Sequence, residues 1–409
     1  MKDNQAKYPQ LRFKGFTNPW EKRKLGELMD VTSVRRIHQS DWRDKGVPFY
    51  RARDLVATAK GKQITDPIFI SEKTYEEYSI QSGKVRRGEL LVTGVGTLGV
   101  AYLVPDNKPL YFKDGNVIWF KNATMNGDFL YYSFTGERTQ RFIKLSAGTG
   151  TVGTYTIDTG KKTPISVPSH DEQIKVGTFF SHLDRLIAVN QRKLAKLKEL
   201  KQGYLQKMFP RNGSKFPQLR FAGFADAWEQ RKFGELYKKN LERNKDHFSS
   251  DRTISIATMR FKKEGNGAAE NSLVSYKVLR EGDIAFEGHT SKRFAFGRFV
   301  LNDIGDGIMS PRFTTLRPTQ DMPIKFWKQY IHYEPIMRYP IVNSTKLGTM
   351  MNELVVDEFL NQPVLVPELS EQEKIGSFFQ QLDETIALHQ RKLEKLQELK
   401  KGYLQKMFC

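Results

Sequence analysis

The chain has 409 residues, enough for two or three domains that each bury their own core. It carries 66 Lys and Arg against 46 Asp and Glu, a formal net charge of +20 at pH 7, which favours a polyanionic partner such as nucleic acid. No apolar run approaches the roughly 18–20 residues of a membrane-spanning helix, the first ten residues lack the apolar core of a signal peptide, and a single cysteine, Cys409, excludes an internal disulfide. These features predict a globular protein of the reducing cytoplasm.

Two segments of the sequence occur twice. Residues 9–28 return as 217–236 with 14 of 20 positions identical, and residues 172–209 return as 371–408 with 26 of 38 identical. Between these copies lie a first insert (roughly 31–168) and a second insert (roughly 239–366), which hardly resemble each other. A repeated frame with two different inserts indicates one architecture used on two targets, which is typical of a binding protein and not of an enzyme with one active site.

The first insert reads as a mixture of helix and strand. Apolar and β-branched residues predict strands over 47–50, 64–70, 89–93, 99–104 and 117–120. A longer periodic stretch over 129–145 predicts a helix. A last short strand over 165–167, followed by Pro168, leads into the first copy of the long repeat.

Both copies of the long repeat are predicted to be helices with a heptad seam. Apolar residues recur at alternating steps of four and three over about 37 residues, or roughly 55 Å of helix. Such a seam must be buried, either against the other helix, whose spacing matches, or against the adjoining globular region. The predicted seam residues are Leu183, Ile187, Leu194, Leu197 and Tyr204 in the first helix and Leu382, Ile386, Leu393, Leu396 and Tyr403 in the second.

The seam also contains polar residues at matching positions of the two copies. Asn190 and Lys201 of the first helix correspond to His389 and Lys400 of the second. Inside a seam, such residues lower stability but can fix the register and orientation of the helices.

Residues 210–215 (PRNGSK) form a predicted linker, after which the second insert repeats the mixed pattern. Strands are predicted over 253–258, 283–286, 294–301 and 313–316, and a helix over 324–337, whose end Pro335 should disturb. A short strand over 364–366 and Pro367 precede the second long helix. A faint similarity between residues 85–91 and 278–284 indicates that the inserts share a fold while their surfaces differ.

No catalytic motif stands out. Gly94–Gly99 matches GxGxxG, with Asp114 where a ribose-binding acid would lie, but residues 101–104 read as a strand, so a glycine-rich hairpin is the better interpretation. No spacing of His, Cys, Asp or Glu fits a metal site, and no nucleophile–base pair is recognisable. We therefore predict no catalytic residue and no bound metal.

Basic and polar residues gather in both inserts beside predicted strand ends and glycine turns. Lys and Arg neutralise phosphates, whereas Arg and Ser can also read base edges. As a group these residues are predicted to contact DNA, and the alternative for any single one is a solvated surface charge. The candidates are Arg51, Arg53, Lys84, Arg86, Arg87 and Lys113 in the first insert and Arg260, Lys262, Lys263, His289, Ser291, Lys292, Arg293, Arg298 and Arg312 in the second.

The repeated motifs resemble those of a known family. Each long helix follows a Val-Pro-x-x-x-Glu-Gln run, at residues 167–173 and 366–372, and continues as Phe-Phe-x-x-Leu-Asp-x-x-Ile and then Gln-Arg-Lys-Leu. This arrangement resembles the specificity (S) subunit of type I restriction–modification systems. The resemblance covers essentially the whole chain and is close in the repeats but weak in the inserts.

The resemblance implies two α/β (α+β) target recognition domains joined by two long helices that form an antiparallel coiled coil, with a pseudo-two-fold internal repeat. The expected divisions are recognition domain 1 (1–168), helical region 1 (169–209), recognition domain 2 (210–366, with the linker 210–215) and helical region 2 (367–409). Each recognition domain would read one half of an asymmetric, bipartite site in double-stranded DNA, and the coiled coil would set the spacer.

The resemblance also implies partners that perform the chemistry. Two methyltransferase (M) subunits, docked largely on the helical regions, would carry S-adenosylmethionine and methylate adenine. Restriction (R) subunits would add translocation and cleavage driven by ATP and Mg. This chain would then be a non-catalytic specificity subunit with no cofactor and no membrane attachment. Two other hypotheses stay open: an autonomous DNA-modifying enzyme, and a coiled-coil adaptor that binds only proteins.

Overall fold

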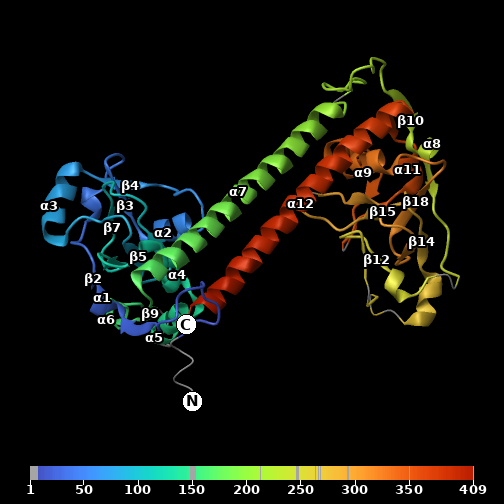
Figure 1. The fold of residues 1–409 in the computed structure, drawn as a ribbon. Coiled ribbons are helices and arrows are strands. Elements are labelled where there is room, and N and C mark those ends of the chain that lie inside the picture. Colours follow the sequence, from blue (N-terminus) through green and yellow to red (C-terminus); the bar gives the residue numbers. More distant parts are fainter. Residues whose placement is uncertain are drawn as a thin grey trace. The chain divides into compact units, whose positions relative to one another are not determined.

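The computed structural model describes residues 8–147, 153–211, 213–245, 248–262, 264–265, 267, 269–292, 294–349 and 351–408. They fall into two compact units, the first comprising Met1–Gln191 and Arg391–Cys409 and the second Arg192–Gln390. Two helices of 39 residues each, α7 (His170–Met208) and α12 (Leu369–Met407), run without a break and contribute one half to each unit (Figure 1). Within the described part of the chain, no helix is apolar over the length needed to cross a membrane.

Over its described residues, the first unit contains nine strands and six shorter α-helices besides its share of α7 and α12. Its strands are β1 (Glu21–Lys24), β2 (Asp30–Thr32), β3 (Val47–Tyr50), β4 (Ile68–Ile70), β5 (Leu90–Thr93), β6 (Ala101–Leu103), β7 (Tyr111–Phe112), β8 (Val117–Lys121) and β9 (Pro164–Val167). Its shorter helices are α1 (Leu25–Leu28), α2 (Ala52–Ala59), α3 (Glu72–Ser82), α4 (Gly127–Thr135), α5 (Glu137–Ser146) and α6 (Ile157–Lys162), with a 3₁₀ turn at Gln39–Asp41.

A four-stranded antiparallel sheet of order β2-β8-β5-β6 forms the centre of the first unit. Side chains alternate between its faces, as strand geometry requires. Ile118 and Phe120 of β8 enter a core shared with α4, α7 and the end of α12, whereas Trp119 enters a second core under the β4-β3-β7 sheet and the helices α2 and α3. Both faces are covered, which explains why β5 and β8 are almost wholly apolar.

The second unit is built on the same plan. Its strands are β10 (Glu229–Lys232), β11 (Tyr237–Lys239), β12 (Ile254–Ser255), β13 (Arg260–Phe261), β14 (Lys277–Leu279), β15 (Ile284–Glu287), β16 (Arg298–Leu301), β17 (Gly307–Met309), β18 (Thr314–Pro318), β19 (Thr345–Lys346), β20 (Glu353–Leu354) and β21 (Pro363–Val366). Its helices are α8 (Phe233–Leu236), α9 (Ile324–His332), α10 (Glu334–Val342) and α11 (Val356–Leu360), with 3₁₀ turns at Ser250–Arg252 and Glu270–Ser275.

The central sheet of the second unit has the order β11-β18-β15-β16, again antiparallel throughout. One face packs on α9, α10 and the long helices, and the other packs on the short strand pairs β12-β13 and β14-β17. Two sequences with almost no identity therefore form the same sheet, which confirms the predicted pair of α+β domains with a shared fold. The units differ in what covers the outer face: a three-stranded sheet in the first, and separate two-stranded pairs in the second.

The short repeats form a frame that attaches each domain to the long helices. A strand within the short repeat pairs with the strand before the long helix in the same register in both units, Glu21 with Val167 and Glu229 with Val366. Both oxygens of the buried Glu172 carboxylate accept hydrogen bonds from Arg12, at 2.7 Å each. Arg220 binds Glu371 in the same manner in the second unit, at 2.9 and 2.7 Å.

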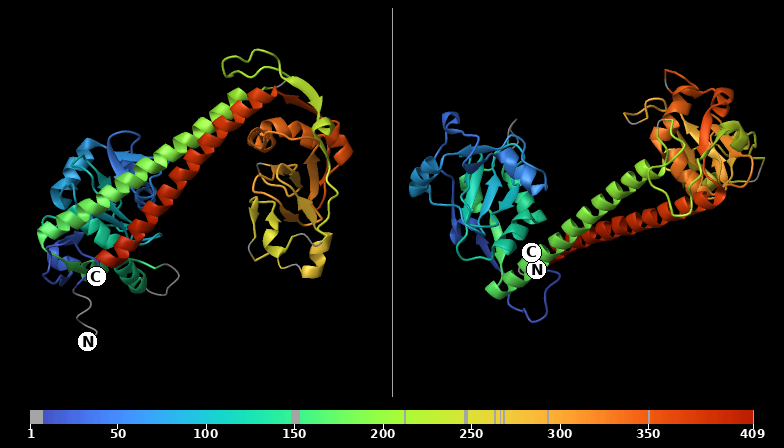
Figure 2. Two further views of the ribbon diagram at one scale, coloured as in Figure 1. Left: turned by 45° about the vertical axis from the view of Figure 1, so that its right-hand side comes forward. Right: turned by 90° about the horizontal axis from the view of Figure 1, so that it is seen from above.

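Within each unit, the two helix halves pack against each other in opposite directions. In the first, Phe179 of α7 meets Tyr403 of α12 with ring centroids 5.1 Å apart, and Lys400 of α12 pairs with Asp184 of α7 at 2.5 Å. The second unit contains the same contacts with the helices exchanged, Tyr204 against Phe378 at 4.9 Å and Lys201 against Asp383 at 2.6 Å. The C-terminal end of α12 lies in the first unit (Figure 2).

All ten predicted seam residues are buried or half-buried, while the residues between them are mostly exposed. The seam also packs on the globular domains: Phe180 lies in the core of the first domain, and Phe379 in that of the second. In each unit the seam is therefore buried by both the other helix and the adjoining domain.

Two predicted helices are broken in the structure. The stretch 129–145 forms α4 and α5, which are separated at Gly136, a residue with extended backbone angles. The stretch 324–337 ends at His332, and Pro335 lies in the first turn of the next helix, α10, instead of at a helix end. A proline there would clash with the carbonyl of Ile331 in a continuous helix, but the first turn tolerates it because its N–H groups need no helical partner.

A first prediction concerns the buried Arg12–Glu172 pair. Replacing Arg12 by Met leaves a carboxylate that is 1% exposed without its main partner, which should cost about 3–5 kcal/mol. Arg23→Met in the same repeat removes an ion pair whose side chains are 39% and 47% exposed, so it should cost less than about 1 kcal/mol. Chemical denaturation followed by circular dichroism compares the two variants, and equal losses would contradict the role given to the buried pair.

A second prediction concerns the helix seam. Leu393 is 7% exposed, so Leu393→Asp should bury an unpaired carboxylate and lower the free energy of unfolding by at least about 3 kcal/mol. Leu194→Asp should do the same from the other helix, since Leu194 is 6% exposed. The matched control is Leu388→Asp, at a position of α12 that is 58% exposed, which should melt within a few degrees of the parent. A seam variant that melts like this control would show that the helix pair does not depend on these leucines.

Candidate nucleic-acid interface

In the first unit, Arg51, Arg53 and Lys113 lie at one end of the β4-β3-β7 sheet. Arg51 follows β3, and the N–H of Lys113 donates to the neighbouring Tyr50 carbonyl at 2.8 Å. The Arg51 guanidinium is largely buried and binds both oxygens of Asp54, at 2.7 and 3.0 Å, so it fastens the start of α2. Arg53 is more than half exposed and only loosely paired, at 3.8 Å from Asp54. Arg53 and Lys113 are thus better placed than Arg51 to meet a ligand.

Lys84, Arg86 and Arg87 form an exposed turn between α3 and β5. Lys84 pairs with Glu76 at 2.6 Å, whereas the side chains of Arg86 and Arg87 form no ion pair with any described residue. The turn is firmly built, because the N–H of Arg86 donates to the buried Glu89 carboxylate at 2.7 Å and the N–H of Arg87 donates to Asn107 at 2.9 Å. A rigid backbone therefore presents two unpaired guanidinium groups to solvent.

In the second unit, the structure brings together candidates that are far apart in sequence. His289 follows β15 and Arg312 precedes β18, and their side chains lie 3.4 Å apart. Arg298, at the start of β16, pairs with Glu287 at 2.6 Å and donates to the carbonyl of Ala257, in the turn that leads to Arg260. His289, Arg298, Arg312 and Arg260 thus mark one end of the central sheet. Arg298 is engaged within the protein, while the other three are exposed.

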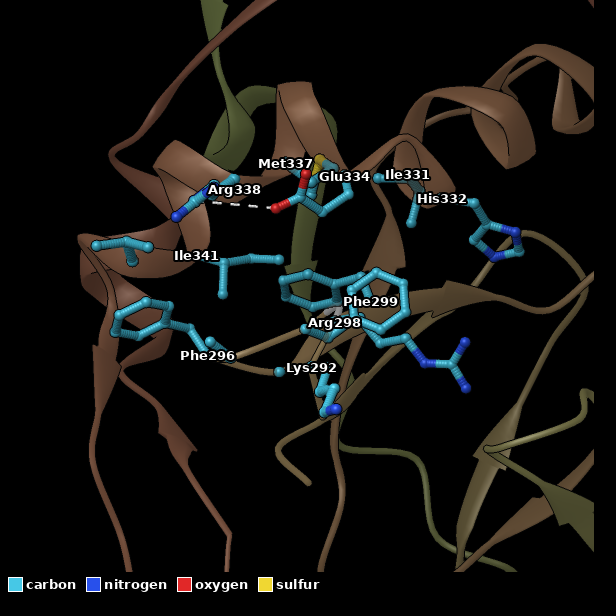
Figure 3. A pocket seen from close by; sticks show the side chains of 14 residues that line it. Lys292, Phe296, Arg298, Phe299, Ile331, His332, Glu334, Met337, Arg338 and Ile341 are labelled. Carbon is cyan, nitrogen blue, oxygen red and sulfur yellow. Dashed lines mark ion pairs between the residues drawn. The ribbon is translucent and has the colours of Figure 1, made fainter. Parts of the chain in front are cut away.

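The remaining candidates lie in loops of the second unit. Lys262, Ser291 and Lys292 are exposed, whereas Lys263 and Arg293 lie outside the described residues. Lys292 and Arg298 border a cavity of about 280 Å³ between the β15–β16 loop and the helices α9 and α10 (Figure 3). Its walls are mixed, with Phe299 and Met337 among the apolar residues, and Arg338 in its lining pairs with Glu334.

Buried carboxylates that the sequence analysis did not single out support both sets of loops. Glu89, 5% exposed, accepts hydrogen bonds from Arg86 N–H and the Trp119 indole, and burial raises its pKa. Asp283 lies at the corresponding point before β15, and burial raises its pKa, although hydrogen bonds from Arg317 oppose the shift. Each acid accepts a backbone N–H of the turn before a central strand and so fixes that turn. A single Glu or Asp in a sequence gives no sign of this role.

Arg317 and Arg280 extend this support into an ionic network in the second unit. Both arginines bind Glu242, each at 2.5 Å, and Arg280 also binds Asp306 at 2.6 Å. Burial raises the pKa of Glu242, but the hydrogen bonds from the two arginines outweigh it and hold the pKa below its ordinary value. The network fixes the loops at this edge of the sheet through charges that are neutralised internally.

The conformation of the glycine motif and the arrangement of possible metal ligands are relevant to catalysis. Gly94–Gly99 connects the antiparallel strands β5 and β6, with positive φ at Gly96 and Gly99, which confirms a hairpin and not a nucleotide-binding turn that opens a helix. Among the described residues, no group of three or more His, Cys, Asp or Glu side chains is arranged to hold a metal.

Comparisons with known proteins agree with this architecture. The family model described as the type I restriction modification DNA specificity domain matches residues 17–199 and again 226–398. The type I restriction enzyme MjaIX specificity subunit of Methanocaldococcus jannaschii is 21% identical over 95% of this chain and 92% of its own length. A putative type I restriction enzyme specificity subunit of Haemophilus influenzae is 28% identical, but the alignment spans only 40% of each chain.

Among solved structures, the S subunit of a type I restriction–modification system from M. genitalium has the same fold. It superposes with a TM-score of 0.61 at 14% identity, over 98% of this chain and 99% of that one. The family model matches twice and together covers most of the sequence, once in each half of the repeat. The chain therefore belongs to the family of type I restriction–modification DNA specificity proteins.

Proposed function

We propose that this chain is the sequence-specific DNA recognition subunit of a type I restriction–modification complex, in which each domain reads one half of an asymmetric, bipartite site. One observation carries the proposal: the same sheet order recurs in both units, on a nearly identical frame, while the loops and their charged residues differ. A common frame with divergent loops is what reading two unlike half-sites on one duplex requires. The family to which the chain belongs supports this function.

The placement of the basic residues supports a division of labour within each interface. Exposed cations such as Arg53, Arg87 and Arg312 can neutralise backbone phosphates, which gives affinity and a steep dependence on salt. Side chains fixed by internal hydrogen bonds, such as Arg298 and the His289 imidazole, suit recognition of base edges, which needs defined positions. The net charge of +20 supplies the attraction that brings the chain to DNA before either contact forms.

The long helices supply the spacing and docking part of the proposal. Paired helices have a fixed rise of about 1.5 Å per residue, so a continuous pair of this length is suited to set the spacer between half-sites. Two methyltransferase subunits and the restriction subunits would dock on this chain, largely through the repeated helical regions. S-adenosylmethionine, ATP and Mg would be bound by these partners, the chain itself would be non-catalytic, and the complex would work in the cytoplasm.

Domain exchange tests the two-reader model. Residues 239–366 are replaced by the second insert of another member of the family, and the chain is co-expressed with methyltransferase subunits. Adenine methylation mapped across a genome should change in one half of the recognised sequence only, because the first insert is untouched. If both halves change, or if neither does, the assignment of one half-site to each domain is wrong.

Measuring cofactor binding by the isolated chain distinguishes a recognition subunit from an autonomous enzyme. We expect no binding of S-adenosylmethionine or ATP in calorimetry, because the one glycine motif that suggested a nucleotide site is a hairpin between strands. Tight binding of either cofactor would favour an autonomous DNA-modifying enzyme. A purely protein-binding adaptor would instead give no sequence-specific protection of DNA even with methyltransferase subunits present.

A further inference from the structure

Three cations of the second unit lie close enough to interact at the free edge of the central sheet. Lys239 ends the edge strand β11, and Arg243 follows it and forms an antiparallel bridge with Lys277 at the start of β14. The Lys277 ammonium donates to the Phe313 carbonyl at 2.6 Å, and the Arg243 guanidinium donates to the Ser275 carbonyl at 2.8 Å. We call these three residues the edge cluster.

No carboxylate among the described residues pairs with the edge cluster. Glu242 is adjacent to Arg243 in sequence, but its carboxylate is held by Arg280 and Arg317. Asp283 and Asp306 are bound by the same two arginines. The described acids of this region are therefore held by other partners, and none of them offsets the charge of the edge cluster.

The repulsion between the three positive charges of the edge cluster lowers the stability of the folded domain when no ligand is bound. Lys277 is half-buried, burial lowers its pKa, and the like charges of Arg243 and Lys239 lower it further. Each bond to a carbonyl uses only one donor, so the ammonium retains two N–H groups and the guanidinium several more. The cluster thus has the donors and the charge that an oxyanion requires.

At the same edge of the central sheet in the first unit, the cations have partners within the domain. There β2 takes the place of β11, and the segment after it contains Arg35 and Arg36. Arg36 pairs with Asp114 at 2.9 Å, and the Arg35 guanidinium lies 4.1 Å above the ring of Tyr78. Both arginines have partners inside the domain, so an unneutralised edge cluster is a property of the second unit.

The position of the edge cluster points to its ligand. Phe313, whose carbonyl holds Lys277, follows Arg312, and Arg312 contacts His289 at the end of the sheet where the candidate DNA contacts gather. A duplex that meets Arg312 and His289 therefore passes beside the cluster. Because the cluster presents ammonium and guanidinium groups and no acceptor, it suits a phosphate and not a base edge.

We propose that Lys239, Arg243 and Lys277 bind a backbone phosphate of the DNA half-site read by the second unit, and so position the duplex without reading its sequence. The proposal rests on the proposed function of DNA recognition, which it extends to a specific contact. It requires only the spare donors of the three cations, and no rearrangement of the Glu242 network.

The test uses the full chain co-expressed with methyltransferase subunits, with Lys239→Gln, Arg243→Gln and the double variant. Binding to a 30-bp duplex of random sequence is measured between 50 and 200 mM NaCl. The site accounts for one phosphate, so the double variant should reduce the slope of log Kd against log salt by about 0.9 and make the weakening across this range about three- to fourfold smaller. Each single substitution should reduce the slope by part of that amount. The methylated sequence should stay the same, because phosphate contacts carry no base information.

Lys238→Gln is the matched control. Lys238 is an exposed lysine of the same strand, and the like charges that act on Lys277 are those of Arg243 and Lys239 and not that of Lys238. It should leave the slope unchanged. Slopes of the cluster variants that equal the parent's, an equal effect of Lys238→Gln, or a change of methylated sequence would each overturn the phosphate site. Failure of DNA recognition itself is seen separately, as an absence of sequence-specific methylation by the parent chain.

Discussion

In each unit a lysine of one long helix is held by an aspartate of the other, and the rest of the frame depends on that pairing. Asp184 accepts the Lys400 ammonium and also the Tyr132 hydroxyl of the first domain, while Asp383 accepts Lys201 and the Gln329 amide of the second. A shift of one helical turn, about 5.4 Å, would leave a lysine and an aspartate unpaired in a largely apolar seam. The same four groups therefore fix the helix register and attach each domain to the helices.

This frame explains how the inserts can differ so widely. The buried Arg–Glu pairs and the Lys–Asp pairs come from repeated residues, and each two-stranded attachment joins a strand of the short repeat to the last strand of the insert. All of them recur with the same geometry in both units. What the inserts must supply is an antiparallel four-stranded sheet and a helix that reaches the aspartate, from Tyr132 in one case and Gln329 in the other. The loops at the sheet ends do not take part in this attachment to the long helices, so they can vary with the DNA sequence that the domain recognises.

The frame could be predicted from the sequence far better than the interface. The heptad spacing indicated the long helices, and the 85–91 and 278–284 similarity indicated the shared sheet. The Arg12–Glu172 pair joins residues 160 positions apart, and no local pattern reveals it. Single side chains are harder still: the sequence does not show that Arg51, a predicted DNA contact, also fastens α2. Nor does it show the edge cluster, because Lys277 lies 34 positions beyond Arg243 and the two are joined only by a β-bridge. Pairing partners of this kind are set by tertiary structure.

The first unit is built from two separate segments of the chain, which affects how it folds during synthesis on the ribosome. Phe408 packs against Trp20, Phe129 and Phe180, so the hydrophobic centre of the first unit includes a ring that is translated long after the other three. At about 5–20 residues per second, Phe408 follows Phe180 by roughly 10–45 s. During that interval the nascent domain exposes an incomplete apolar surface. The second unit needs no such delay beyond its own synthesis, because residues 192–390 are contiguous.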